Sequence, residues 1–153
     1  MSYFAVIDTN VIVSSFLTKY TDTATAQVID AVVDGRIIPL YNEDVLAEYK
    51  DVLCRPRFSF ESGKTEAFIR MIRSLGIYVN PSPSGEVLPD ADDLVFYEIV
   101  MERRDDGAYL VTGNMRHYPA KPCIVTPAQM MRIIEGKSHG NAAENTLEQP
   151  NPK

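Results

Sequence analysis

The chain contains little cysteine, no excess of positive charge and no long hydrophobic run. Its two cysteines lack the paired spacing of a zinc site or a disulfide framework. No apolar segment approaches the ~20 residues that a membrane-spanning helix needs. The net charge of -6 argues against a broad basic surface for non-specific nucleic-acid binding. A nucleic-acid substrate held locally through metal ions is still compatible with this charge.

The composition, with 45% hydrophobic and 24% charged residues, is typical of a soluble globular domain. The N-terminal segment MSYFAVIDTN has no basic region, and Asp8 interrupts its apolar stretch, so we expect no signal peptide and a cytoplasmic location. One domain is expected over residues 1–136. Residues 137–153 contain one large apolar residue, Leu147, and are expected to be disordered.

Short apolar runs alternate with amphipathic segments along the chain. Runs rich in β-branched and aromatic residues predict strands at 3–7, 36–41, 77–79, 108–112 and 123–126. Apolar residues at helical spacing predict helices at 22–35, 42–55, 64–76, 92–104 and 127–136. Pro39 suggests that the second strand lies at an edge or ends early. The alternation predicts an α/β fold, a three-layer αβα sandwich around a central, mostly parallel sheet of about five strands.

Polar residues follow two of the predicted strands. Asp8, Thr9 and Asn10 follow the first strand, and Thr112 and Asn114 follow the fourth. In open α/β sheets, ligands bind at the carboxyl ends of the strands. A carboxylate or an amide beside a buried strand also needs a hydrogen-bond partner or an ion. The alternative for Asp8 is a cap on the next helix or turn.

Helical phase adds two further carboxylates. Glu48 lies at the edge of the apolar face of the helix at 42–55, and Asp93 falls on the inward face of the helix that follows the run PDADD. A solvated glutamate at the rim is the alternative for Glu48. Asp90 and Asp92 are expected to be first-turn acids that the helix dipole favours.

Convergence of Asp8, Glu48 and Asp93 would be costly without a cation. Two like charges ~4 Å apart cost about 4 kcal/mol at an effective dielectric near ~20. Oxygen ligands without a neighbouring Cys or His pair favour Mg²⁺ or Mn²⁺ over zinc. Such an ion at the end of a sheet suggests phosphodiester hydrolysis, because it lowers the pKa of water and stabilises the charge on the leaving oxygen.

Four segments carry a family resemblance: AVIDTNVIVSSFL, DVLAEYKDVL, LPDADDLVFYEIV and AYLVTGNMRHYP with the CIVTPAQMM that follows it. In this order and spacing they resemble PIN-domain proteins of the branch that includes toxins of toxin–antitoxin pairs, over most of residues 3–135. The resemblance implies a metal-dependent nuclease that cleaves single-stranded RNA and uses an acidic quartet to hold Mg²⁺ or Mn²⁺. It also implies an antitoxin protein as partner and self-association as a dimer.

The family's functional positions carry over one at a time. Asp8, Glu48, Asp93 and Asn114 match the catalytic quartet, with the first three as metal ligands. Thr9, Asn10, Asp92 and Thr112 take supporting polar positions, and Arg116 and His117 are candidates for contact with phosphate.

Asn114 departs from the aspartate that many PIN domains carry at the fourth position. An amide adds no charge, so we expect weaker binding at any second metal site and a low or substrate-restricted activity. A degenerate PIN fold that binds a partner without catalysis is the alternative function. For His117 the alternative, and the preferred interpretation, is a loop histidine held by a backbone carbonyl. Basic residues at 55–73 are expected to be a solvated helix surface, with RNA binding as the less favoured alternative.

Overall fold

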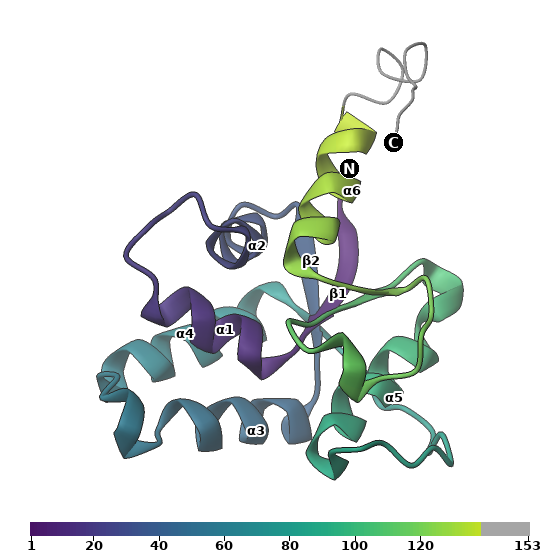
Figure 1. Cartoon of the computed structure of the whole chain (residues 1–153), viewed down its shortest axis with the longest axis horizontal. Coiled ribbons are helices and arrows are strands. Elements are labelled where there is room, and N and C mark those ends of the chain that lie inside the picture. Colours follow the sequence, from purple (N-terminus) through teal and green to yellow (C-terminus); the bar gives the residue numbers. More distant parts are fainter. Residues whose placement is uncertain (139–153) are drawn as a thin grey trace.

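The computed structural model describes residues 1–138 (Figure 1). Most of the tail predicted to be disordered, residues 139–153, lies outside the described residues, whereas residues 137 and 138 complete the last helix. The strands are β1 (Tyr3–Ile7), β2 (Ile37–Tyr41), β3 (Ile77–Tyr78), β4 (Tyr109–Val111) and β5 (Ile124–Val125). They form one sheet in the order β3-β2-β1-β4-β5 with every pairing parallel. The predicted parallel sheet of about five strands is therefore confirmed.

Six α-helices connect and cover the strands. They are α1 (Thr9–Leu17), α2 (Ala24–Val33), α3 (Glu43–Leu53), α4 (Ser62–Leu75), α5 (Leu94–Glu102) and α6 (Pro127–Ser138). Figure 1 shows α1, α2 and α4 on one side of β1 and β2, and α5 on the other, which gives the three layers. Among residues 1–138, no helix has the length and apolar character needed to cross a membrane.

Capping residues explain where two of the helices begin. The Thr23 side chain accepts a hydrogen bond from the backbone N–H of Ala26 and so caps the first turn of α2. Asn42 follows β2 directly and accepts a 2.9 Å hydrogen bond from the backbone N–H of Val45. The chain therefore passes from β2 into α3 without a loop, so the position of α3 is fixed at the carboxyl end of the sheet.

Two features differ from the prediction. Helix α1 was not predicted, because the run VIV in its sequence is equally compatible with a strand. The expectation that Pro39 marks an edge or an early end was wrong, since β2 lies between β1 and β3 and continues to Tyr41. In a parallel strand, the backbone groups of successive residues point alternately to the two neighbouring strands. The carbonyl oxygen of Tyr41 points to the β3 side, because it accepts a hydrogen bond from the backbone N–H of Val79, the residue after β3. The backbone of Pro39, two residues earlier, therefore points to the same side. Because β3 begins only opposite Leu40, the missing N–H of Pro39 costs no hydrogen bond between the strands.

Tyr49 of α3 joins three elements in the core. Its side chain is 1% exposed, and its hydroxyl donates a 2.6 Å hydrogen bond to the carbonyl oxygen of Ile7, the last residue of β1. Its ring stacks on Phe96 of α5 and meets Phe68 of α4 edge to face. Asp8 follows Ile7 and Glu48 precedes Tyr49, so this contact sets the position of both carboxylates.

Candidate active site

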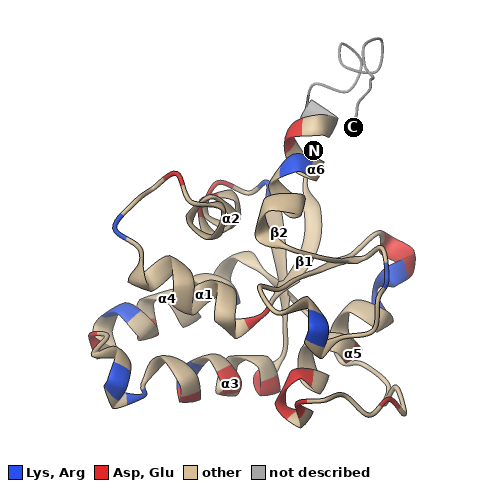
Figure 2. Ribbon diagram, viewed as in Figure 1, with Lys and Arg blue, Asp and Glu red and all other residues tan. Residues whose placement is uncertain are grey.

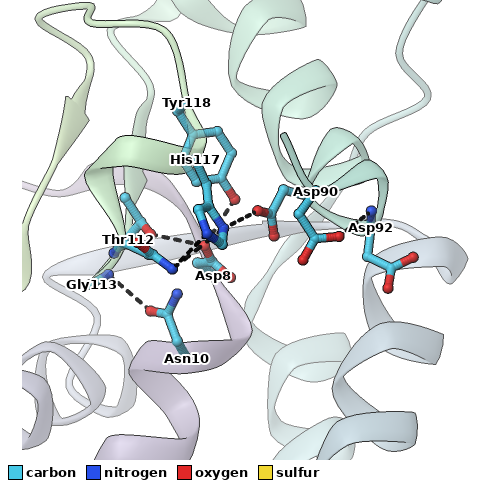
Figure 3. Close-up of polar contacts among 10 residues, drawn as sticks. Asp8, Asn10, Asp90, Asp92, Thr112, Gly113, His117 and Tyr118 are labelled. Atoms are coloured by element: carbon cyan, nitrogen blue, oxygen red, sulfur yellow. Dashed lines mark hydrogen bonds and ion pairs between the residues drawn. The ribbon is translucent and has the colours of Figure 1, made fainter. Parts of the chain in front are cut away.

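Asp8 lies at the junction of β1 and α1 and is 3% exposed. Its Oδ2 atom accepts two hydrogen bonds of 2.8 Å, from the hydroxyls of Thr112 and Tyr118 (Figure 3). No side-chain capping bond to α1 is formed, so the alternative of a simple helix cap is not what the structure shows. Two hydroxyl donors instead fix one oxygen of the carboxylate, and the backbone N–H groups of Thr9 and Asn10 also stabilise its charge.

Residues after β4 form the second wall of the site. Thr112 is fully buried, donates to Asp8 and accepts a 2.9 Å hydrogen bond from the backbone N–H of Asn114. Asn10 accepts a 2.9 Å hydrogen bond from the backbone N–H of Gly113. A Cβ at Gly113 would lie 3.1 Å from this Asn10 oxygen, so a glycine suits the close approach. These bonds tie the loop after β4 to the start of α1.

A chain of three side chains runs from Asp93 to Asn114. The Nδ1 atom of His117 lies 2.8 Å from Oδ2 of Asp93, and its Nε2 atom lies 3.0 Å from Nδ2 of Asn114. The neutral imidazole protonated at Nδ1 satisfies both contacts, because Nδ1 then donates to the carboxylate and Nε2 accepts from the amide. The preferred interpretation of His117 as a histidine held by a backbone carbonyl was therefore wrong.

Asp90 joins this group from the segment before α5. Its Oδ1 atom accepts a 3.0 Å hydrogen bond from the backbone N–H of Asp92, as expected of a first-turn acid. In addition, Asp90, Asp93 and His117 each offer a ligand atom, and these atoms lie within 4.8 Å of one another. Asp92 is exposed, and Figure 3 shows its carboxylate pointing away from the group.

The side chains predicted from the sequence line one cavity of about 410 Å³. Asp8, Glu48, Asp93 and Asn114 are among its lining residues, together with Thr9, Asn10, Asp92 and His117. Thr112 does not line the cavity and contributes to the site through its hydrogen bond to Asp8. Arg116 is exposed and does not line the cavity, whereas Arg55 and Arg57 do.

Burial and mutual repulsion raise the pKa values of the carboxyls. Burial raises the pKa of Asp8, and the hydrogen bonds from Tyr118 and Thr112 oppose this effect. Burial and the charge of Asp8 raise the pKa of Asp93 to about 6, with His117 acting in the opposite direction. Burial, followed by the charges of Asp92 and Asp51, raises the pKa of Glu48. Each raised pKa means that the charged form of the carboxylate is unfavourable in this environment, and an added cation would stabilise that charge.

The donor atoms of this site fit a hard divalent ion. Asp93 keeps its Oδ1 atom without a hydrogen-bond partner among residues 1–138, and Asp8, Asp90 and Glu48 supply further oxygens at the same cavity. The hydroxyl of Thr9, another residue of the cavity wall, is buried and lacks a partner among the described residues. Asp90, Asp93 and His117 offer ligand atoms close enough to share one ion, and Asp8 and Glu48 line the same cavity.

The raised pKa values predict a pH-dependent stability. In the metal-free protein, Asp93 keeps its proton up to about pH 6 when folded, but loses it near its ordinary value when unfolded. Stability should therefore fall as the pH rises from about 4 to beyond 6. After discounting for solvent, we expect a loss of about 1–2 kcal/mol, or a few degrees in melting temperature. Thermal melts in chelator at pH 5 and 7.5 would check this, and Asp93→Asn should reduce the difference.

Two contributors to the site, Tyr118 and Asp90, were not predicted from the sequence, and for a third, Arg55, RNA binding was only the less favoured alternative. Tyr118 was assigned no role beyond its place in a motif, although its hydroxyl donates a hydrogen bond to Asp8. Burial and the charge of Asp8 raise the pKa of Tyr118, so the hydroxyl keeps its proton and stays a donor. Asp90 was taken as a first-turn acid alone. Arg55 was placed on a solvated helix surface. An aromatic residue following a strand-end loop was the one available signal for Tyr118.

Carboxylates at the carboxyl edge of a parallel sheet, held by hydroxyl donors and lining one cavity, have the donor chemistry of an oxygen-ligand metal site on an α/β domain. The family comparison gives the class a name: the PIN domain matches residues 5–116, and the chain belongs to this family. PIN domains are generally metal-dependent nucleases that act on nucleic acids, and they often pair with antitoxins. A comparison with curated proteins finds no match.

Proposed function

We propose that this chain is an endoribonuclease that hydrolyses phosphodiester bonds of single-stranded RNA with Mg²⁺ or Mn²⁺. The observation that supports it most strongly is the convergence of Asp8 and Asp93, two buried carboxylates, on one cavity of a PIN fold. Their charges repel each other, and Asp90 and Glu48 add more negative charge nearby. Such an arrangement is stable at neutral pH with a bound cation.

The protein's own residues would hold and orient the reacting groups. When bound, the divalent ion would supply Lewis-acid stabilisation of the phosphate and increase the acidity of water. Thr112 and Tyr118 fix Oδ2 of Asp8, and His117 fixes Oδ2 of Asp93, so both carboxylates would be held in place for the ion. Glu48 lies at the edge of the cavity with a raised pKa, which suits a group that accepts the proton of the attacking water.

The metal-binding proposal predicts a large thermal shift. Mn²⁺ at about a hundred times its dissociation constant should stabilise the fold by ~2.7 kcal/mol, which for a domain of this size is roughly 5–10 °C. The same protein should cleave a mixed single-stranded RNA pool with Mn²⁺ or Mg²⁺, and should not cleave it in chelator. Duplex RNA and single-stranded DNA of the same sequences are the matched substrates.

Asn114 is the observation that favours the second candidate, a PIN-fold binding module with little or no catalysis. Its amide binds His117 and brings no charge to the site. Absence of cleavage, together with no effect of Mn²⁺ on the melting temperature, would support this candidate and contradict the nuclease. Cleavage that requires the metal would exclude it.

The cellular role rests on the family resemblance. We propose that the chain is the toxin of a toxin–antitoxin pair, acts in the cytoplasm, binds an antitoxin protein and forms a homodimer. The nuclease unit would be residues 1–136. Co-expression with the product of an adjacent gene, followed by size-exclusion chromatography with light scattering, would test the partner and the dimer together.

A further inference from the structure

The connection between α3 and α4, residues 54–61, borders the cavity that contains Asp8. Arg55, Arg57 and Phe58 of this connection line the cavity wall. The other charged residues of the wall are all acidic. Figure 2 shows Lys and Arg gathered around this connection and the start of α4, while Asp and Glu lie along α3 and around the segment before α5. A polyanion that enters the cavity therefore meets cations on this side alone.

The two arginines are available for a ligand. Arg57 forms no hydrogen bond or ion pair within residues 1–138, and its guanidinium carbon lies 4.8 Å from the centre of the Phe58 ring. Arg55 forms a 3.2 Å ion pair with Asp51 in which both side chains are substantially exposed. Exposed pairs of this kind contribute little to stability, so a phosphate can replace Asp51 as partner.

Aromatic rings in the same connection are held in a fixed stack. The rings of Phe58 and Phe60 are nearly parallel, with centres 5.3 Å apart and an interplanar angle of 9°. Ser59 between them has φ 55°, the only non-glycine residue with positive φ in residues 1–138. Ser59 ends the short 3-10 helix Pro56–Phe58 in the left-handed conformation common at helix C-termini, and this turn brings Phe60 beside Phe58. Phe60 also packs edge-on against Phe16 of α1, which anchors the stack to the fold.

We propose that this connection is the substrate-binding platform, where a nucleobase stacks on the Arg57–Phe58 pair and Arg55 and Arg57 contact the phosphates beside the cleaved bond. Stacking on aromatic and guanidinium planes is how proteins bind single strands without reading their sequence. A base within a duplex has no free face, so the platform selects single strands over duplexes. The inference rests on the proposed nuclease function and specifies how its substrate is held.

Binding and cleavage are measured separately to test the platform. Binding of a fluorescent single-stranded RNA 12-mer is followed by anisotropy at several salt concentrations, with Mg²⁺ present and Asp8→Asn in every protein to prevent cleavage. Arg57→Gln and Phe58→Leu are compared with Arg132→Gln, which removes one exposed charge from α6 outside the cavity. Cleavage by the same three variants is measured with Asp8 intact.

Each platform variant should weaken binding about tenfold, and the control should not. Arg57→Gln should also reduce the slope of log K against log salt by about 0.7, the value for one lost phosphate contact on a single strand. Phe58→Leu should leave that slope unchanged, because a lost stack releases no counterions. In cleavage, both variants should raise KM with kcat nearly unchanged.

The outcomes separate the platform from the nuclease. If the protein with Asp8 intact cleaves RNA but the platform variants bind like Arg132→Gln, the platform is wrong and the nuclease stands. If the protein with Asp8 intact does not cleave but binding depends on Arg57 and Phe58, the platform stands and the nuclease is wrong. If RNA is neither bound nor cleaved, both are wrong.

Discussion

Replacing Asp8 with asparagine is expected to reduce metal-dependent RNA cleavage about a thousandfold. The change removes the charge of a carboxylate close to the ion. Even two unit charges ~4 Å apart attract by roughly 4 kcal/mol at an effective dielectric near ~20, which equals about three factors of ten in rate. The initial rate of cleavage of one single-stranded RNA, measured at saturating Mn²⁺ for proteins purified identically, checks this prediction.

The Asp8→Asn fold should survive, which makes the loss interpretable. An asparagine oxygen can accept the same hydrogen bonds from Thr112 and Tyr118, and removal of a charge near Asp93 relieves repulsion. In chelator, the variant should therefore melt at or above the temperature of the wild type. The matched control is Asp105→Asn, an exposed aspartate outside the cavity. Equal cleavage by Asp8→Asn and Asp105→Asn would place the chemistry elsewhere.

The two buried carboxylates of the cavity could be found from the sequence because they follow a buried strand or lie on a predictable helix face. Asp8 ends a run that is apolar throughout, and Asp93 has the helical phase of buried residues, so each had to be buried or close to burial. The parallel sheet followed from the alternation of elements, and the carboxyl edge then brought β1 and β4 together. Hydrophobic periodicity and the rule that ligands bind at the carboxyl ends of parallel strands were therefore sufficient to predict where Asp8 and Asp93 lie.

Contacts between distant segments could not be found in this way. Tyr118 reaches Asp8 across 110 positions of sequence, and no periodicity links them. His117 reaches Asp93 only because the loop after β4 folds toward the segment before α5. Helix α1 was missed because its β-branched residues satisfy a strand pattern, and its burial against α2 decides the outcome. Tertiary packing, which a single sequence does not display, determines each of these features.

Replacing Tyr49 with alanine is expected to destabilise the domain by about 3–5 kcal/mol. The ring is fully enclosed by α3, α4, α5 and β1, so its loss leaves a cavity, and the carbonyl of Ile7 loses the 2.6 Å hydrogen bond from the hydroxyl. Tyr49→Phe keeps the ring and should cost only about 1 kcal/mol, the usual contribution of one hydrogen bond. Urea unfolding followed by circular dichroism measures both.

Tyr20→Ala is the control, because Tyr20 is 69% exposed and its removal should change stability by less than about 0.5 kcal/mol. Tyr49→Phe has a further use, since Tyr49 lies beside Glu48 and its hydroxyl binds the residue before Asp8. If this bond sets the spacing of the two carboxylates, Tyr49→Phe should lower kcat several-fold while the protein stays folded at the assay temperature. Unchanged kcat would show that packing of the ring alone positions α3 against β1, and that the hydroxyl serves stability only.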